Sequence, residues 1–390
     1  MKRLLVQFSL WLLGLYCLSF LADLFLLYAP TFPYADAILP NYNLPRWIYS
    51  WANFDGVHYL TIVSHGYIGT GLIQAFFPVY PGLIWLDGLF HINAIISGQI
   101  ISLVSFFGVL LIWSKLFEKE FTKSISHISL GLLLLFPTSF FFAAVYTESL
   151  FLLLILSSFY FARKKQWMYA IILAAVASGT KVIGIALLPA LVIEYLYQRN
   201  LLQSQFISHP KKLLHEINFT DFTKLITIFL SAGGLLLYMI FLWIEFRDPL
   251  YFFHVQEEFG GGRSESLILL PQVLVRYIKI FVTVDWQNWK FFAYTQEFAL
   301  SILALTTLIV GWIKKLRPSY LVFSSLAFLL PTLTGTFSSM PRYILVCFPM
   351  FLVIAKWLED KPKLRFAWYG ISSILLILNT VLFIQGYWIA

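Results

Sequence analysis

Long apolar runs separated by short basic clusters constrain this chain more than any other feature of its sequence. The runs occupy residues 5–27, 76–90, 94–113, 129–145, 147–162, 168–180, 182–197, 223–246, 296–313, 320–336, 342–357 and 366–388. Of the 390 residues, 60% are hydrophobic and 12% are charged, about half the charged fraction that is usual in soluble domains. We therefore predict an all-α, polytopic transmembrane helical bundle of about 11 membrane segments, forming one domain over residues 1–390.

The basic clusters predict how the chain crosses the membrane. Lys2 and Arg3 precede an apolar run that is long enough to span about 30 Å of hydrocarbon, so we expect a retained first helix that begins inside. Five further clusters can be cytoplasmic together with them. These are Lys115/Lys119/Lys123, Arg163/Lys164/Lys165, Arg199/Lys211/Lys212/Lys224, Lys314/Lys315/Arg317 and Lys356/Lys361/Lys363/Arg365.

This orientation leaves two long loops, residues 28–75 and 247–295, on the non-cytoplasmic side. It also requires a single net crossing by residues 76–113, although these form two apolar segments. Either one of these segments is re-entrant, or the loop at 115–127 is assigned to the wrong side of the membrane.

Two other classes of function are excluded by the pattern of residues. The net charge of +8 is distributed as topogenic clusters rather than as a basic groove with interleaved aromatic residues, so we expect no nucleic-acid partner. Cys17 and Cys347 lie singly within apolar runs, which is not the pattern of a disulfide framework or a metal cluster.

The first outer loop contains the acid that most resembles a catalytic group. Asp55 lies among aromatic residues and shares one helical face with His58, Tyr59 and Ile62. Apolar surroundings can raise the pKa of a carboxyl group, which suits a general base. The structural alternative is that Asp55 caps the N-terminus of a helix at 55–65.

Four motifs in this order resemble the PIG-V family of mannosyltransferases. The first is Phe54-Asp55-Gly56-x-His58-Tyr59-Leu60-x-Ile62, which continues to Gly66-Tyr67 and is followed by Ala75-Phe76-Phe77-Pro78-x-Tyr80-Pro81. The others are Tyr146-Thr147-Glu148-Ser149-Leu150-Phe151, then Ser178-Gly179-Thr180-Lys181 with Gly184 and Leu187-Leu188-Pro189, and finally Met340-Pro341-Arg342-Tyr343 with Phe348-Pro349. The resemblance extends from about residue 45 to about residue 355.

The resemblance implies a GT-C glycosyltransferase fold with its active site on the non-cytoplasmic face. The membrane would be the plasma membrane in a prokaryote and the endoplasmic reticulum in a eukaryote. The donor would be a polyprenyl-phosphate hexose, typically dolichyl-phosphate mannose, and the acceptor a hydroxyl of a lipid or a glycan. Asp55 would be the general base of an inverting transfer. No cofactor beyond the lipid-linked co-substrate, and no divalent metal, is implied.

By the same resemblance, two cations would bind the donor phosphate and five further residues would contact the substrates. The cations are Lys181 and Arg342, and the substrate-binding residues are Glu148, His58, Trp51, Tyr67 and Tyr343. We expect Asp55, Glu148, Lys181 and Arg342 to converge on one cavity near the outer leaflet. The sequence departs from the family pattern at Phe54, where Trp is usual, at Lys181, where Arg is usual, and over residues 68–74, which lack an acid.

Three of these residues also have a structural interpretation. Glu148 could be a surface acid in a turn, Lys181 a lysine that reaches along an apolar surface to water, and Tyr343 a bystander or a hydrogen-bond partner. His58 and His65 are seven residues apart, which does not match the i, i+4 pair of helical zinc motifs.

The second outer loop combines a glycine run with an amphipathic segment. Gly260, Gly261 and Gly262 precede the stretch 271–284, and Trp286 and Trp289 follow it. This segment could close over the cavity as a lid, or lie in the membrane interface anchored by its Trp residues and membrane lipids.

Two other functions remain as alternatives to glycosyl transfer. A multi-pass transporter or a flippase for lipids or lipid-linked sugars would also use broken helices and internal charges. A non-catalytic partner in a glycan-assembly complex is the third interpretation.

Overall fold

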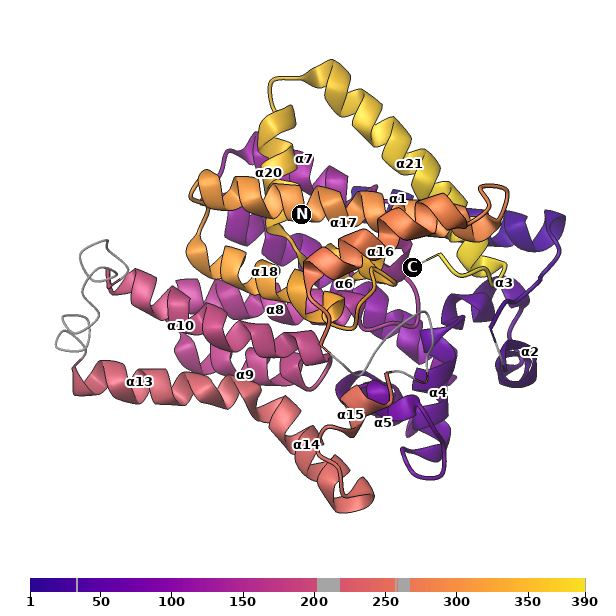
Figure 1. Cartoon of the computed structure of the whole chain (residues 1–390), viewed down its shortest axis with the longest axis horizontal. Coiled ribbons are helices and arrows are strands. Elements are labelled where there is room, and N and C mark those ends of the chain that lie inside the picture. The colour runs from indigo at the N-terminus through magenta and orange to yellow at the C-terminus, as the bar shows by residue number, and fades with distance from the viewer. Residues whose placement is uncertain (33, 202–217, 257, 259–266, 390) are drawn as a thin grey trace.

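The computed structural model describes residues 1–32, 34–201, 218–256, 258 and 267–389 (Figure 1). Within these residues, all regular secondary structure is helical. The prediction of an all-α chain is therefore confirmed. The predicted glycine run at 260–262 lies outside the described residues.

Five helical segments are long and apolar enough to cross a membrane. They are α1 (Lys2–Phe25), α6 (Ala94–Phe117), α13 with α14 (Phe219–Phe229 and Gly233–Phe246), α17 (Trp289–Ile313) and α21 (Pro362–Ile384). At 1.5 Å per residue these segments are about 34 to 42 Å long, which exceeds the hydrocarbon thickness of about 30 Å. A sixth crossing is possible where residues 340–346 meet α20 (Pro349–Leu358), with a bend of 82° between them.

The remaining apolar runs form helices that are too short to cross a bilayer alone. These are α5 (Val79–Gly88), α7 (Lys123–Leu134), α8 (Glu148–Arg163), α9 (Trp167–Ser178), α10 (Leu187–Gln198) and α18 (Pro318–Thr332). Helices of 10 to 16 residues reach only about 15 to 24 Å. The structure thus supports five or six spans, and the predicted count of about 11 is not confirmed. Hydropathy identified the apolar runs, but the tertiary fold determined how many of them form a full-length helix.

The length of α5 bears on the uncertain segment 76–113. Its ten residues extend about 15 Å, whereas the 24 residues of α6 extend about 36 Å. A single net crossing by α6 preceded by a short, non-crossing α5 therefore fits these lengths better than two crossings.

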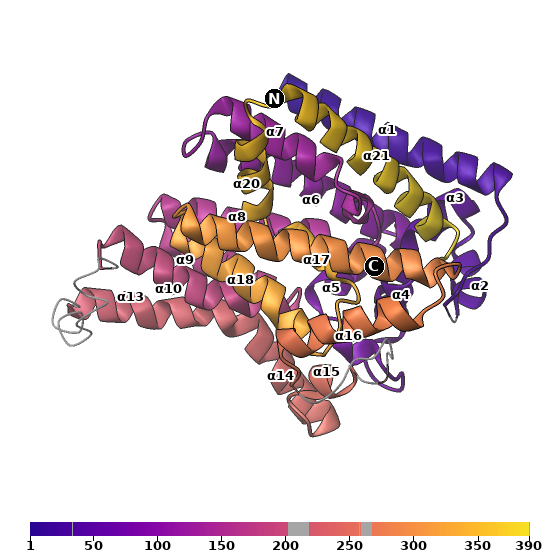
Figure 2. The ribbon, with the colours of Figure 1, turned by 45° about the horizontal axis from the view of Figure 1, so that its top comes forward.

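Helix α8 forms the centre of the bundle. Twelve of its sixteen residues are buried, as expected for a helix that is apolar on every side. It packs between α6 and α9 and also contacts α10, while α10 packs on α18 and α7 packs on α20. Figure 2 shows α1 and α21 side by side along one edge of the molecule, where they are in direct contact.

The two long loops contain short helices. Residues 28–75 form α2 (Ala35–Ile38), α3 (Arg46–Tyr49) and α4 (Asp55–His65), with 3-10 turns at Leu39–Tyr42, Ser50–Ala52 and Ile73–Ala75. Residues 247–288 include α15 (Tyr251–His254) and α16 (Leu270–Thr283). Figure 1 shows α16 lying across α17, so the amphipathic stretch predicted at 271–284 is a helix on the outside of the bundle.

A close approach between α9 and α14 fixes where α9 ends. The Leu235 N–H donates to the Ser178 hydroxyl at 3.2 Å. A Cβ atom added at Gly234 would lie 2.2 Å from the carbonyl oxygen of Ala175. This contact requires glycine and holds the segment after Ser178 against the bundle. Lys181 lies in that segment.

Gly234→Ala should therefore destabilise the protein, because its methyl group would push α14 away from the α9 backbone. Overpacking of this kind costs about 1 to 3 kcal/mol. Gly233→Ala is the matched control, since its Cβ would meet only the Ala175 side chain at 3.8 Å. Thermal unfolding in detergent, followed by tryptophan fluorescence, should show a lower Tm for Gly234→Ala alone. Equal Tm values for the two variants would contradict the proposed contact.

Candidate functional site

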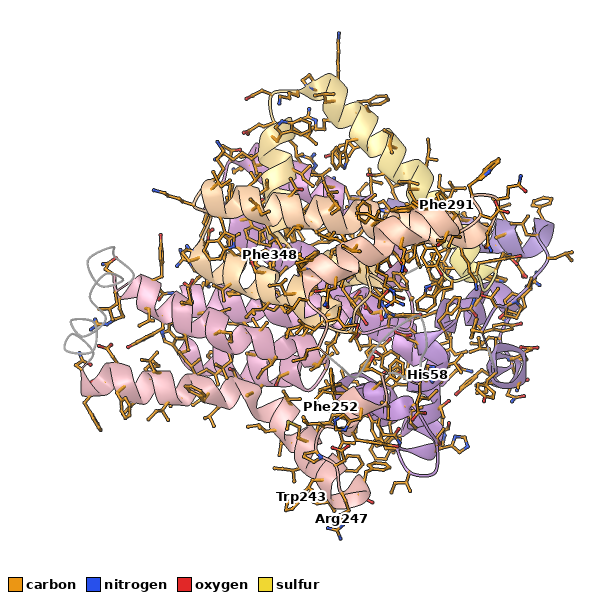
Figure 3. All side chains as sticks on the ribbon, in the orientation of Figure 1. His58, Trp243, Arg247, Phe252, Phe291 and Phe348 are labelled. Carbon is orange, nitrogen blue, oxygen red and sulfur yellow. The ribbon has the colours of Figure 1, made fainter. Side chains whose placement is uncertain are left out.

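A large cavity lies where the first outer loop meets the segments around α16, α17 and α19 (Met340–Tyr343). Its volume is about 1210 Å³, above the range of about 300–1,000 Å³ that is typical of sites for one small molecule. Asp55, His58, Lys181, Arg342 and Tyr343 all line it. Figure 3 shows His58 on the side of the molecule where α4, α5 and α15 lie, near the lining residue Phe252.

Asp55 is held in position by hydrogen bonds between the first outer loop and the segment just before α8. The Tyr146 hydroxyl accepts a hydrogen bond from the Asp55 backbone N–H at 3.2 Å and donates to the carbonyl of Asn53 at 3.0 Å. The Asn53 side chain in turn donates to the carbonyl of Phe383 at 2.8 Å. Phe54 between them has φ 58°, a strained conformation for a non-glycine residue. The chain thus turns sharply just before the acid.

The Asp55 carboxylate forms an ion pair with Arg342, although the two residues are 287 positions apart in the sequence. Asp55 is the first residue of α4, and neither it nor the capping residue Phe54 makes a side-chain capping hydrogen bond. The N-cap interpretation is therefore wrong. The backbone next to Arg342 is also fixed, because the Thr138 hydroxyl donates to the carbonyl of Pro341 at 2.6 Å.

A second acid joins the two predicted phosphate-binding cations. Lys181 Nζ donates to Glu148 Oε1 at 2.7 Å, and Arg342 Nε lies 3.4 Å from the same oxygen. The latter contact is an ion pair without hydrogen-bond geometry, since Arg342 Nε has no hydrogen-bond partner among the described residues. The Glu148 side chain is 1% exposed, so the surface-turn interpretation of this residue is wrong.

The four residues predicted to converge form one connected network of two carboxylates and two cations. Asp55, Lys181 and Arg342 reach the cavity, but Glu148 lies behind them and does not line it. The network has no formal net charge at neutral pH. A ligand anion that enters the cavity must therefore compete with a carboxylate for Arg342 or Lys181.

The network lowers the pKa of Asp55, contrary to the expectation from its apolar surroundings. Burial raises the pKa of this carboxyl, but the charge and hydrogen bond of Arg342, together with the charges of His58 and Lys181, outweigh burial. Asp55 is thus ionised at neutral pH. Burial lowers the pKa of His58, against the opposing charge of Asp55. Its imidazole is therefore mainly neutral at pH 7, and its charge acts on Asp55 only at the lower pH where the imidazole is protonated.

Tyr343 contacts both cations through its ring. Lys181 Nζ lies 4.6 Å and the Arg342 guanidinium carbon 5.2 Å from the ring centroid. Such contacts contribute about 0.5 to 2 kcal/mol each. Tyr343 therefore helps to hold the cations side by side, a role that the sequence did not suggest.

The structure places the other predicted substrate-binding residues differently. The His58 ring lines the cavity and stacks on Phe76, with 4.8 Å between centroids. Trp51 is fully buried against Tyr16, and the Tyr67 hydroxyl donates to the carbonyl of Phe76 at 2.7 Å. Neither Trp51 nor Tyr67 lines the cavity. Both side chains instead pack against the first outer loop on the side away from the cavity.

The sequence did not single out a second polar wall of the cavity. Arg276, Glu297 and Lys290 line it from α16 and α17. The Tyr277 hydroxyl donates to Glu297, and Arg276 donates to the carbonyl of Gly335 at 3.0 Å. An ionisable residue within an apolar helix, such as Glu297, is the signal that could have revealed this wall.

Metal chelation is not built into the described part of this site. Within the described residues, no group of three or more His, Cys, Asp or Glu side chains could hold a metal ion. His65 contacts the Ser64 hydroxyl at 2.8 Å rather than His58 or Asp55.

No protein-family model, no curated protein and no solved structure shows significant similarity to this chain. The resemblance of its four motifs to the PIG-V family stays a prediction.

Arg342→Gln should destabilise the protein strongly, because it leaves the carboxylates of Asp55 and Glu148 facing each other without their shared cation. Breaking a buried ion pair typically costs about 3 to 5 kcal/mol. Asp55→Asn combined with Arg342→Gln should recover part of this loss, since one unpaired charge is also removed. Thermal unfolding in detergent measures both effects.

Arg46→Gln is the matched control. Arg46 pairs with Asp23 at the end of α1, where the two side chains are 28% and 21% exposed, and such pairs contribute about 0 to 1 kcal/mol. Equal destabilisation by Arg342→Gln and Arg46→Gln would show that the buried network contributes no more to stability than an exposed ion pair does.

Proposed function

We propose that this chain is an integral membrane glycosyltransferase of the GT-C type. It would move a hexose, mannose by its family resemblance, from a polyprenyl-phosphate donor to a hydroxyl of a lipid or glycan acceptor. The observation that carries the proposal is the pairing of Asp55 with Arg342 on the wall of a large cavity, beside Lys181. An acid next to two potential phosphate ligands is the arrangement that such a transfer needs.

The donor phosphate would bind between Lys181 and Arg342. Arginine and lysine are the usual side-chain ligands of phosphate, and arginine can bind it through two parallel hydrogen bonds. Because both cations are already paired with carboxylates, the phosphate would replace Asp55 at Arg342. Glu148 lies behind the cavity wall and would keep the two cations in place.

Donor binding would also prepare the base. Arg342 is the main opposing charge that lowers the pKa of Asp55. Once a phosphate occupies Arg342, that stabilisation of the carboxylate weakens, and the added negative charge raises the proton affinity of Asp55. The acid would thus become an effective base only when the donor is present.

The transfer step then follows from these positions. The acceptor O–H gives its proton to Asp55 as its oxygen forms a bond to the anomeric carbon of the hexose. The bond between that carbon and the phosphate oxygen breaks, and polyprenyl phosphate leaves with the bonding electron pair. Attack from the side opposite the phosphate inverts the anomeric configuration. Lys181 and Arg342 would stabilise the charge that develops on the leaving phosphate.

The far end of the bundle supports an outward-facing site. The basic connections between helices are tied together there: Arg163 pairs with Glu120, and Arg317 donates to Glu194 at 2.6 Å. Thr122 donates to Glu359 at 2.7 Å, which links two more of these connections. Under the positive-inside rule this end would be cytoplasmic, so the cavity would open on the non-cytoplasmic side. The membrane would be the plasma membrane or the endoplasmic reticulum, depending on the source.

Two observations favour transfer over transport. Lys181 and Arg342, the cations proposed to bind the donor phosphate, lie together beside Asp55 on the cavity wall, whereas a transporter needs a path to the other side. At the far end, Glu194 is fully buried and is bound by Arg317 and by the Ser319 hydroxyl at 2.6 Å, which ties α10 to the start of α18.

Asp55→Asn should reduce transfer by roughly 10² to 10⁴ fold, the usual contribution of a general base. The assay uses membranes that contain the full-length chain, incubated with radiolabelled polyprenyl-phosphate mannose, and measures label in lipid and glycan products. Asp36→Asn is the matched control, because Asp36 is an exposed acid of the same outer loop. It should retain wild-type transfer.

Equal turnover by Asp55→Asn and wild type would end the general-base assignment. Accumulation of intact labelled donor across the membrane, with no label in any product, would instead favour the transporter interpretation.

A further inference from the structure

A second cavity lies at the opposite end of the bundle, between α1, α7 and α21. Its volume is about 750 Å³, within the range of about 300–1,000 Å³ for small-molecule sites. It shares no lining residue with the cavity that contains Asp55. Glycosyl transfer therefore leaves it without a role.

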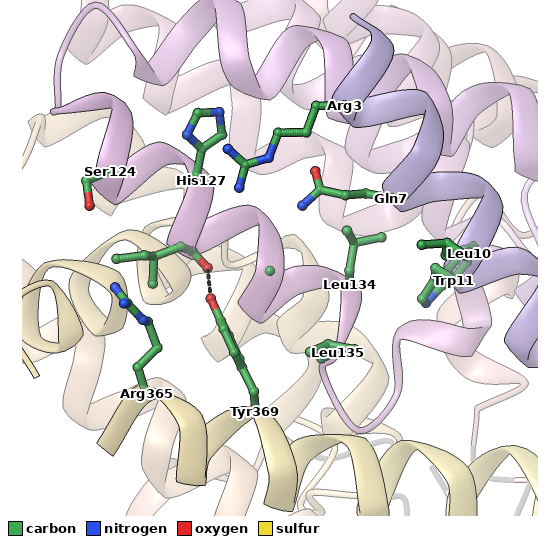
Figure 4. Close-up of a pocket in the computed structure, with 12 residues that line it drawn as sticks. Arg3, Gln7, Leu10, Trp11, Ser124, His127, Leu134, Leu135, Arg365 and Tyr369 are labelled. Atoms are coloured by element: carbon green, nitrogen blue, oxygen red, sulfur yellow. Dashed lines mark hydrogen bonds between the residues drawn. The ribbon is translucent and has the colours of Figure 1, made fainter. Parts of the chain in front are cut away.

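One end of this cleft is cationic. Arg3 on α1, His127 on α7 and Arg365 on α21 line it, and no carboxylate is among its lining residues. Figure 4 shows the side chains of Arg3 and Arg365 extending from separate helices towards α7, which lies between them. Within the described part of the chain, neither guanidinium forms an ion pair with a carboxylate.

The orientation of the helices adds to this positive potential. All three helices begin at this end, at Lys2, Lys123 and Pro362. Helix N-termini carry partial positive charge and free N–H groups. The cationic end is thus well suited to a negatively charged group.

The other end of the cleft is apolar. Leu10 and Trp11 line it from α1, and Leu134 and Leu135 line it from the end of α7. Leu10 and Trp11 are seven and eight residues beyond Arg3, which corresponds to about 10 to 12 Å along the helix. The cleft therefore passes from charged to apolar over the distance that separates a lipid headgroup from its acyl chains.

A buried polar atom between the two ends also lacks a partner. Gln7 lines the cleft, and its side-chain Oε1 is buried without a hydrogen-bond partner among the described residues. Leaving such an atom unsatisfied costs about 1 to 3 kcal/mol. A hydroxyl group of a bound molecule would satisfy it.

We propose that this cleft binds an anionic glycerophospholipid with a hydroxyl-bearing headgroup, its charged headgroup at the cationic end lined by Arg3 and Arg365 and an acyl chain along Leu10, Trp11, Leu134 and Leu135. Basic pockets between membrane helices on the cytoplasmic side commonly bind anionic headgroups. The basic connections of the bundle lie at this same end. The lipid would join α1, α7 and α21, so it would act as a structural ligand that is independent of the proposed transfer reaction.

The test is native mass spectrometry of the full-length protein, released from detergent after incubation with equal amounts of phosphatidylglycerol and phosphatidylcholine. Wild type should retain phosphatidylglycerol preferentially. Arg3→Gln combined with Arg365→Gln should weaken this binding about tenfold or more, because both positive charges that attract the anionic headgroup are lost. Gln7→Glu places a carboxylate in the cleft and should weaken it without removing either cation.

Lys2→Gln combined with Lys363→Gln is the matched control. Both lysines are exposed, lie in the first turns of α1 and α21 and do not line the cleft. The control removes the same charge from the N-terminal turns of the same two helices, and it should bind phosphatidylglycerol like wild type.

Three results would overturn the proposal. Equal retention by the Arg3/Arg365 variant and the Lys2/Lys363 variant would show only a general attraction to anionic lipid. Displacement of phosphatidylglycerol by millimolar inorganic phosphate would assign the site to free phosphate instead. If the Arg3/Arg365 variant does not fold, unchanged binding by Gln7→Glu would be decisive against the site.

Discussion

The ion pair between Asp55 and Arg342 is the interaction on which the candidate site depends. It joins the first outer loop to a segment 287 residues later, and Glu148 and Lys181 extend it to a connected chain of four charged side chains. Charges removed from water are stable only when they are paired, and the loss of one partner leaves the others unsatisfied. The network therefore holds the cavity wall together in the absence of a substrate.

The same pairing explains how one site could both bind a phosphate and activate a hydroxyl. A carboxylate paired with arginine is a weaker base than an unpaired one. An arginine paired with a carboxylate must give up that partner before it can bind phosphate. The entry of a phosphate would exchange these partners and change the proton affinity of Asp55 in the same step. Under the proposed function, the donor would thus organise the catalytic group before the acceptor reacts.

The two ends of the bundle are built in different ways. The cavity that contains Asp55 is formed by long loops and short helices, such as α4 and α19, whose backbone is held by Tyr146 and Thr138. At the other end, helix termini and basic connections enclose a smaller cleft whose apolar part is lined by residues of α1 and of the end of α7. Irregular backbone at membrane depth requires protein around it, and the buried helix α8 provides this at the centre of the bundle.

Much of this organisation could be predicted from the sequence, because hydropathy and local motifs report on short-range chemistry. The apolar runs determined that the described chain is helical and contains helices long and apolar enough to span a membrane, and the four motifs identified Asp55, Glu148, Lys181 and Arg342 as residues of interest. Only the tertiary structure decided how long each helix is, because the breaks depend on contacts such as that of Gly234 with Ala175. It also decided that Arg342 lowers the pKa of Asp55, that Glu148 lies behind the cavity and that Trp51 and Tyr67 support the loop. These properties arise from the distances between side chains that are far apart in the sequence, and no local pattern of residues encodes those distances.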